Sequence, residues 1–127
     1  MSTVIEGEAE MANLCNTEQD EHWLSDIGKD NPKRREGTFR IDPKDIDNEG
    51  FFVGTFVEQG SSAGKKIRGR CSGNTIYFLR PIDKPRFYYE GAYSNDKKKI
   101  NGTQTSLPHK RGVVQTTEEW EGTKVTR

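Results

Sequence analysis

The ionisable side chains of this 127-residue chain show no spacing that is typical of catalysis or metal binding. The two histidines, His22 and His109, lie far apart, and neither has a cysteine or carboxylate at a zinc-ligand spacing. We therefore expect no metal site, no cofactor and no catalytic residue. This pattern predicts a protein that is not an enzyme.

One enzymatic alternative, a small cyclase or isomerase, needs only a shaped cavity and a single acid or base. The carboxylates nearest to the aromatic segments are Glu58, Asp83 and Glu90. Because aspartate and glutamate are rarely buried, we expect all three to lie on the surface. The enzymatic alternative therefore stays open without a catalytic residue to support it.

The two cysteines, Cys15 and Cys71, are too few for a disulfide framework, and we expect both to be free thiols in a reducing compartment. The first residues carry acids where a signal peptide would have a basic stretch and then an apolar one. No apolar run approaches the roughly 18 residues of a membrane span. We therefore predict a soluble, cytoplasmic protein.

Glycine recurs two residues after a large apolar residue, and this rhythm indicates how the chain folds. The unit occurs five times, at residues 52–54, 67–69, 89–91, 100–102 and 120–122. Residues i and i+2 share one face of a strand, so each unit places a bulky side chain beside a glycine. Glycine within a strand marks strong bending or the close approach of a neighbouring backbone. Five strands bent in this way favour a closed barrel.

Short alternating segments follow one another from Thr38 to the end of the chain. We expect strands near residues 38–42, 50–58, 65–71, 74–79, 86–94, 97–104, 111–117 and 119–126. No helical pattern separates them, so neighbouring strands are expected to be antiparallel and joined by hairpins. The sequence predicts an all-β fold, an antiparallel up-and-down barrel of about eight strands over residues 38–127.

The preceding segment, residues 1–37, differs in composition and charge. Residues 1–31 hold eight acids and one base, a net charge of −7, whereas the rest of the chain carries +7. Large apolar residues are few and irregularly spaced in this segment. We predict a flexible, disordered acidic tail over residues 1–37, with a short helix near residues 17–28 as the alternative.

The strand number, the hairpins and the apolar-x-glycine rhythm resemble the calycin superfold, which comprises the small barrels of lipocalins, fatty-acid-binding proteins and avidins. The likeness covers residues 38–127, and residues 37–39 read Gly-Thr-Phe where lipocalins have Gly-x-Trp. The resemblance implies a lipocalin-like ligand-binding barrel, although likeness of fold does not by itself assign a function.

One face of the predicted strands is apolar and would face the inside of the barrel. Its members are Phe39, Ile41, Phe52, Phe56, Ile67, Cys71, Ile76, Phe78, Phe87, Tyr89, Tyr93, Ile100, Val113 and Trp120. These side chains either fill the interior or line a cavity with polar groups such as Gln104 and Gln115. We predict that a small apolar or aromatic ligand binds among Phe52, Phe56, Phe78, Tyr89, Tyr93 and Trp120.

The opposite face combines bases with aromatic rings. Residues 59–111 hold twelve bases and three acids, a net charge of +9. Bases interleaved with exposed rings suit phosphate contacts and stacking on unpaired nucleic-acid bases. The alternative function is therefore binding of single-stranded nucleic acid or an acidic protein segment; a solvated charged surface explains the same pattern. The residues expected to bind the polyanion are Arg68, Arg70, Tyr77, Arg86, Tyr88 and Lys99.

Overall fold

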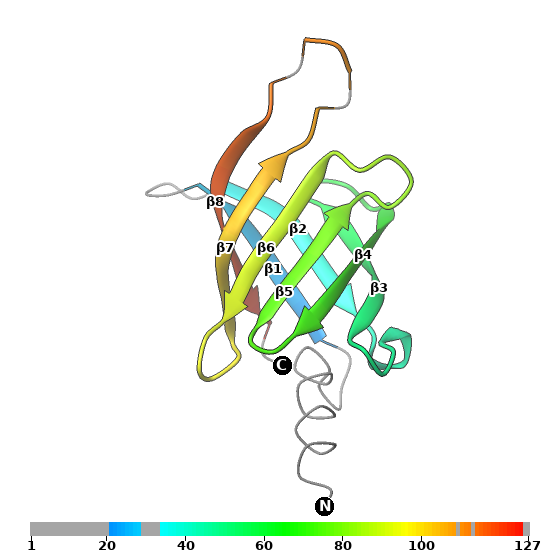
Figure 1. Cartoon of the computed structure of the whole chain (residues 1–127), viewed down its shortest axis with the longest axis vertical. Coiled ribbons are helices and arrows are strands. Elements are labelled where there is room, and N and C mark those ends of the chain that lie inside the picture. Colours follow the sequence, from blue (N-terminus) through cyan, green and yellow to red (C-terminus); the bar gives the residue numbers. More distant parts are fainter. Residues whose placement is uncertain (1–20, 29–33, 109, 113, 126–127) are drawn as a thin grey trace, which may run out of the picture.

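Eight antiparallel strands follow one another round a closed barrel in the order of the sequence, and the last pairs with the first (Figure 1). The computed structural model describes residues 21–28, 34–108, 110–112 and 114–125. The strands are β1 (Glu21–Ile27), β2 (Arg34–Ile41), β3 (Phe51–Glu58), β4 (Gly64–Ser72), β5 (Thr75–Arg80), β6 (Phe87–Tyr93), β7 (Lys99–Ser106) and β8 (Thr116–Lys124). The predicted all-β antiparallel barrel is confirmed.

Helical structure contributes almost nothing to the part of the chain that the structure describes. A short 3-10 helix, η1 (Pro43–Asp45), lies in the connection between β2 and β3. The described residues include no helix with the length and apolar character that a membrane crossing requires.

The first strand lies in the segment that we expected to be a tail. β1 pairs with β2 on one side and with β8 on the other. The placement of residues 21–27 and 34–37 in the tail is therefore wrong, and so is the helix over the described part of residues 17–28. The buried face of β1 consists of Trp23, Ser25 and Ile27. The small polar serine interrupts the apolar alternation by which a strand is recognised in a sequence, so this strand was not predicted. Residues 1–20, where we predicted most of the tail, lie outside the described residues.

The other strands follow the alternating pattern closely, with one exception. β3 to β7 begin and end near their predicted positions, and β2 and β8 overlap theirs. The strand expected at residues 111–117 is wrong, because the chain before Thr116 forms the long connection from β7 to β8 (Figure 1). Gly112 has a φ of 88° there, and Val114 is 75% exposed, so its side chain does not belong to the core.

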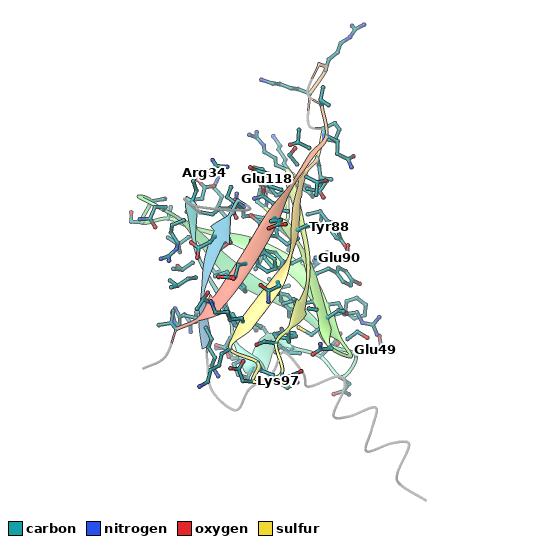
Figure 2. The ribbon with its side chains drawn as sticks, turned by 90° about the vertical axis from the view of Figure 1, so that its left-hand side faces the viewer. Arg34, Glu49, Tyr88, Glu90, Lys97 and Glu118 are labelled. Carbon is teal, nitrogen blue, oxygen red and sulfur yellow. The ribbon has the colours of Figure 1, made fainter. Side chains whose placement is uncertain are left out.

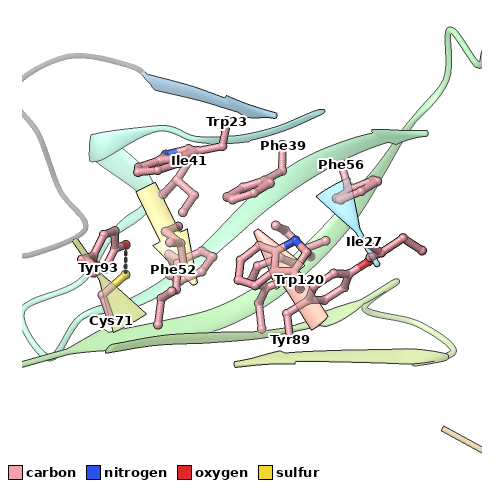
Figure 3. Close-up of a cluster of buried hydrophobic side chains, with 14 residues drawn as sticks. Trp23, Ile27, Phe39, Ile41, Phe52, Phe56, Cys71, Tyr89, Tyr93 and Trp120 are labelled. Atoms are coloured by element: carbon pink, nitrogen blue, oxygen red, sulfur yellow. Dashed lines mark hydrogen bonds between the residues drawn. The ribbon is translucent and has the colours of Figure 1, made fainter. Parts of the chain in front are cut away.

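The predicted inner face of the strands forms the core (Figure 3). Its rings pack closely: Phe78 stacks on Tyr89 with centroids 4.4 Å apart, and Trp120 meets Tyr89 edge-on at 5.2 Å. Most of the predicted members are buried; Phe87 is only half-buried, and Val113 lies outside the described residues. β1 adds two core residues that the sequence reading left in the tail, Trp23 and Ile27.

Cys71 lies in this core on β4, where its Sγ is 3.5 Å from the hydroxyl of Tyr93 (Figure 3). It is disulfide-bonded, and its partner lies outside the described residues. The expectation of a free thiol is therefore wrong for Cys71. The cysteine count excludes only a framework of several disulfides, not a single one. The cytoplasmic location stays a prediction.

Candidate functional site

Polar groups gather at the end of the barrel where β1, β3, β5 and β7 end, which we call the mouth and which lies at the top of Figure 1. Two cavities open there. The larger mouth cavity has a volume of about 680 Å³ and is lined by Glu58, Lys65, Lys66, Arg80, Pro81, Ile82, Asp83, Lys84, Arg86, Phe87, Ser106 and Leu107. The smaller mouth cavity, about 650 Å³, shares three of these residues: Glu58, Arg80 and Phe87.

Glu36 enters the mouth because the pairing of β1 and β2 is irregular at this point. Ser25 pairs with Gly37 and Asp26 pairs with Arg35, so Glu36 is an extra residue on β2. An extra residue of this kind breaks the alternation and redirects a side chain. The carboxylate of Glu36 is consequently buried, with 8% of the side chain exposed, and it lines the smaller mouth cavity.

Four side chains from four other strands donate hydrogen bonds to the Glu36 carboxylate. Oε1 accepts from the hydroxyl of Tyr89 at 2.8 Å and from Oγ of Ser25 at 3.1 Å. Oε2 accepts from Nε2 of Gln104 and, at 3.5 Å, from Nη2 of Arg80. We call these five residues the Glu36 network. Each carboxylate oxygen has two donors, so the charge of Glu36 is well satisfied without a ligand.

The network extends to β8 through the indole of Trp120, whose Nε1 donates to Oγ of Ser25 at 2.8 Å. At its centre, burial raises the pKa of the Tyr89 hydroxyl well above its ordinary value, and the nearby charge of Glu36 raises this pKa further. Tyr89 is therefore a neutral hydrogen-bond donor at ordinary pH.

Arg80 carries the positive charge of this site, and its side chain is as deeply buried as that of Glu36. Its side chain is 7% exposed. The Cζ atom lies over three aromatic rings, 4.1 Å from the centroid of Phe56, 4.6 Å from that of Phe87 and 5.7 Å from that of Tyr89. Its Nη2 faces Glu36, whereas Nη1 is buried and has no hydrogen-bond partner.

This arrangement is suited to binding rather than to proton transfer. A general base needs a free lone pair within reach of its substrate. Glu36 already accepts four hydrogen bonds, and Tyr89 holds its proton tightly. Arg80 has the unused hydrogen-bonding capacity, and a guanidinium binds without being deprotonated.

The structure places the six predicted ligand residues in the core, where the rings of four of them contact one another. These are Phe52, Phe56, Phe78, Tyr89, Tyr93 and Trp120, and each is no more than 5% exposed. None of them lines either mouth cavity. Their contact with a ligand stays a prediction. Gln104 is buried as expected, but Gln115 is exposed in the connection before β8, so its placement in the interior is wrong.

Four of the six residues predicted to bind a polyanion share one outer face of β4, β5 and β6: Arg68, Arg70, Tyr77 and Tyr88. Arg86 instead lines the larger mouth cavity. Lys99 begins β7 at the far end of the barrel, where it pairs with Glu121 at 3.3 Å. Figure 2 shows Tyr88 beside Glu90 on β6, so an acid lies within this outer face as well.

The three carboxylates considered for catalysis lie where the sequence places them, toward the surface. Glu58, Asp83 and Glu90 are exposed, and the first two line the larger mouth cavity. On the rim of the mouth, Arg34 pairs with Glu118 at 3.2 Å (Figure 2). No cluster of three or more His, Cys, Asp or Glu suited to a metal ion occurs among residues 21–28, 34–108, 110–112 and 114–125. His109 falls in one of the gaps.

Arg80, Glu36 and Ser25 are residues of the candidate site that the sequence analysis did not predict. The signal for Arg80 was present, because it follows the buried Ile76 and Phe78 in the same alternation. Glu36 and Ser25 gave no such signal: both lie in the assumed tail, and alternation from Phe39 would turn Glu36 outward.

Comparison of the chain with family models, with curated proteins and with solved structures found no match.

Proposed function

We propose that this protein is a non-enzymatic, calycin-like binding barrel that holds a small, mainly apolar molecule in the larger mouth cavity. The volume of this cavity, about 680 Å³, carries the proposal. Small-molecule sites usually have volumes of about 300–1,000 Å³ and combine an apolar lining with a few polar groups. Pro81, Ile82, Phe87 and Leu107 supply the apolar lining, and Arg80 supplies a buried polar group.

In this function the ligand would lie at the mouth of the barrel and not among the aromatic rings of the core. The aromatic rings of the core already contact one another at distances typical of packed interiors. A ligand at the mouth displaces none of these rings, whereas a ligand among them would have to separate them. The satisfied carboxylate of Glu36 supports binding over an isomerase or cyclase reaction.

Titration of the full chain with N-phenyl-1-naphthylamine, a neutral dye that fluoresces in apolar sites, tests this function. We expect saturable micromolar binding and at least a tenfold loss of affinity in Ile82→Asp, because a carboxylate would enter the apolar lining. Val114→Asp is the matched control, since Val114 is exposed near the same end and lines neither mouth cavity. Absence of saturable binding, or an equal affinity in both variants, would refute the proposal.

The outer face of β4, β5 and β6 favours a second candidate function, binding of single-stranded nucleic acid. The rings of Tyr77 and Tyr88 lie 6.2 Å apart, and the guanidinium of Arg70 lies 4.8 Å from the ring centroid of Phe51. Exposed rings next to guanidinium groups provide stacking and phosphate contacts. Arg68 is exposed on the same face and has no ion pair within the described residues.

Fluorescence anisotropy with a labelled oligothymidylate distinguishes this candidate from a merely charged surface. Arg68→Glu should weaken binding several-fold more than Lys99→Glu, because Lys99 lies at the far end of the barrel. Binding should also fall steeply with added salt. Equal effects of the two reversals, or no binding at low salt, would remove the outer face as a nucleic-acid site.

A further inference from the structure

One nitrogen of Arg80 has no partner, although it is buried. Nη1 is inaccessible to solvent and forms no hydrogen bond, whereas Nη2 of the same group faces Glu36. It is the only side-chain nitrogen or oxygen with both properties in the part of the chain that the structure describes. Buried polar atoms are normally hydrogen bonded, so an exception within a cavity wall calls for an explanation.

The network around Arg80 cannot supply the missing acceptor. Both oxygens of Glu36 already receive two hydrogen bonds each. The rings of Phe56, Phe87 and Tyr89 also lie against the guanidinium, and they interact with its charge but not as ordinary hydrogen-bond acceptors. An acceptor for Nη1 would therefore come from a molecule in the cavities that Arg80 lines.

The charges around the larger mouth cavity favour an anionic molecule. Its lining contains five bases and two acids. Four of these bases, Lys65, Lys66, Lys84 and Arg86, have no ion pair among the residues that the structure describes. Glu36 offsets the charge of Arg80, but the field of the other bases remains and attracts a negative group toward the cavity.

Phe87 is the ring next to the guanidinium that also lines both mouth cavities. It is half-buried, and its ring centroid lies 4.6 Å from Cζ of Arg80. Phe56, the closer ring, is fully buried in the core. A rotation of Phe87 would therefore uncover more of the guanidinium without displacing a fully buried core ring.

We propose that the ligand is a small organic anion, an apolar body with one carboxylate or sulfonate group, and that Nη1 of Arg80 binds the acidic group after Phe87 moves aside. This inference rests on the proposed function, since it specifies which molecules enter the same mouth. The apolar lining holds the body of the ligand, and the guanidinium selects its charge. A hydrogen bond between two charged groups is stronger than one between neutral groups.

Two dyes that differ in one acidic group test this inference on the full chain. N-phenyl-1-naphthylamine is neutral, and 8-anilino-1-naphthalenesulfonate adds a sulfonate to the same skeleton. We expect the sulfonate to bind at least tenfold more tightly, and we expect Arg80→Met to reduce this preference to less than about twofold. Phe87→Ala keeps the guanidinium and uncovers it, so the sulfonate should associate faster with this variant than with the wild type.

The outcomes separate the two proposals. If neither dye binds, the proposed function fails and the inference fails with it. If both dyes bind with equal affinity, the binding function stands and the anion preference is refuted. Where Arg80→Met does not fold, selective ¹³Cζ labelling of arginine in the wild-type chain replaces it. The Arg80 signal should then shift with the sulfonate and not with the neutral dye, and an unchanged signal would overturn the role of Arg80.

Discussion

The carboxylate of Glu36 receives hydrogen bonds from strands β1, β5, β6 and β7, so a single residue of β2 connects most of the barrel at its mouth. Its position opposite Arg80 engages Nη2 of the guanidinium, while Nη1 of the same group stays buried without a hydrogen-bond partner. In the proposed function Glu36 is therefore a positioning residue, which holds Arg80 and Tyr89 in place through its hydrogen bonds.

Substitution Glu36→Gln should destabilise the protein strongly. The amide removes the negative charge and leaves the buried guanidinium of Arg80 without its counter-ion, a change that typically costs about 3–5 kcal/mol. Glu118→Gln is the matched control, because Glu118 pairs with Arg34 on the exposed rim and such pairs contribute less than about 1 kcal/mol. Urea unfolding of both variants measures the difference, and similar losses in the two would contradict the role given to Glu36.

The hydroxyl of Tyr89 should make stability depend on pH in the alkaline range. Burial and the charge of Glu36 raise the pKa of Tyr89 in the folded state, whereas in the unfolded chain it ionises near 10. Above pH 10 the unfolded state therefore loses this proton first, and the folded state loses stability as the pH rises toward the folded pKa. Tyr89→Phe lacks this contribution.

Denaturant unfolding of wild type and Tyr89→Phe at pH 8 and pH 11 checks this expectation. At pH 8 the variant should be less stable by about 1–3 kcal/mol, because Glu36 loses one donor in a buried site. At pH 11 the difference should become smaller, since only the wild type loses the contribution of Tyr89. A constant difference at both pH values would show that Tyr89 does not ionise differently in the two states.

At the scale of the strands, glycine allows the barrel to close tightly. Gly91 of β6 pairs directly with Gly102 of β7. A Cβ at Gly102 would collide with the carbonyl oxygen of Glu90 and with the Cα of Gly91, which are backbone atoms that cannot rotate away. The apolar-x-glycine rhythm therefore marks a close neighbouring backbone at Gly54, Gly69 and Gly102, whereas Gly122 faces only side chains.

Gly102→Ala should accordingly destabilise the barrel by about 1–3 kcal/mol, the usual cost of overpacking. Gly122→Ala on the neighbouring β8 is the control, because its nearest neighbour would be the flexible end of Ile100 at 3.3 Å. Thermal unfolding should show a clearly lower Tm for the Gly102 variant. Equal Tm values for the two variants would mean that the backbones of β6 and β7 separate without cost.

Alternation in the sequence predicts strands β3 to β7 and most of the core, because apolar residues and glycines recur at steps of two on one face of these strands; in β7 only Ile100 and Gly102 carry the pattern. The same rule extended by one step, from Phe78, places Arg80 inside. It fails at Ser25, a small polar residue on a buried face, and at Glu36, where an extra residue reverses the alternation. The hydrogen-bond network at the mouth therefore includes two residues, Ser25 and Glu36, whose buried positions alternation does not predict.

For the whole molecule, closure depends on β1. This strand forms hydrogen-bonded pairs with β2 and β8, and its Ser25 links the indole of Trp120 to Glu36. Without β1 the facing edges of β2 and β8 would lose their partners, and Trp23 and Ile27 would be absent from the core. A chain that began at residue 38, the domain boundary expected from the sequence, would also lack Glu36 of β2.

A truncated variant spanning residues 38–127 should consequently fail to fold, whereas one spanning 21–127 should fold cooperatively. The shorter variant leaves two unpaired strand edges, a buried Arg80 without its counter-ion and a gap in the core, and each defect lowers stability. Both truncations remove Cys15, one of the two cysteines, so the full chain under reducing conditions is the reference for the effect of the disulfide. Circular dichroism and urea unfolding distinguish the results. A cooperative transition for 38–127 would show that seven strands suffice for the fold and that β1 is dispensable.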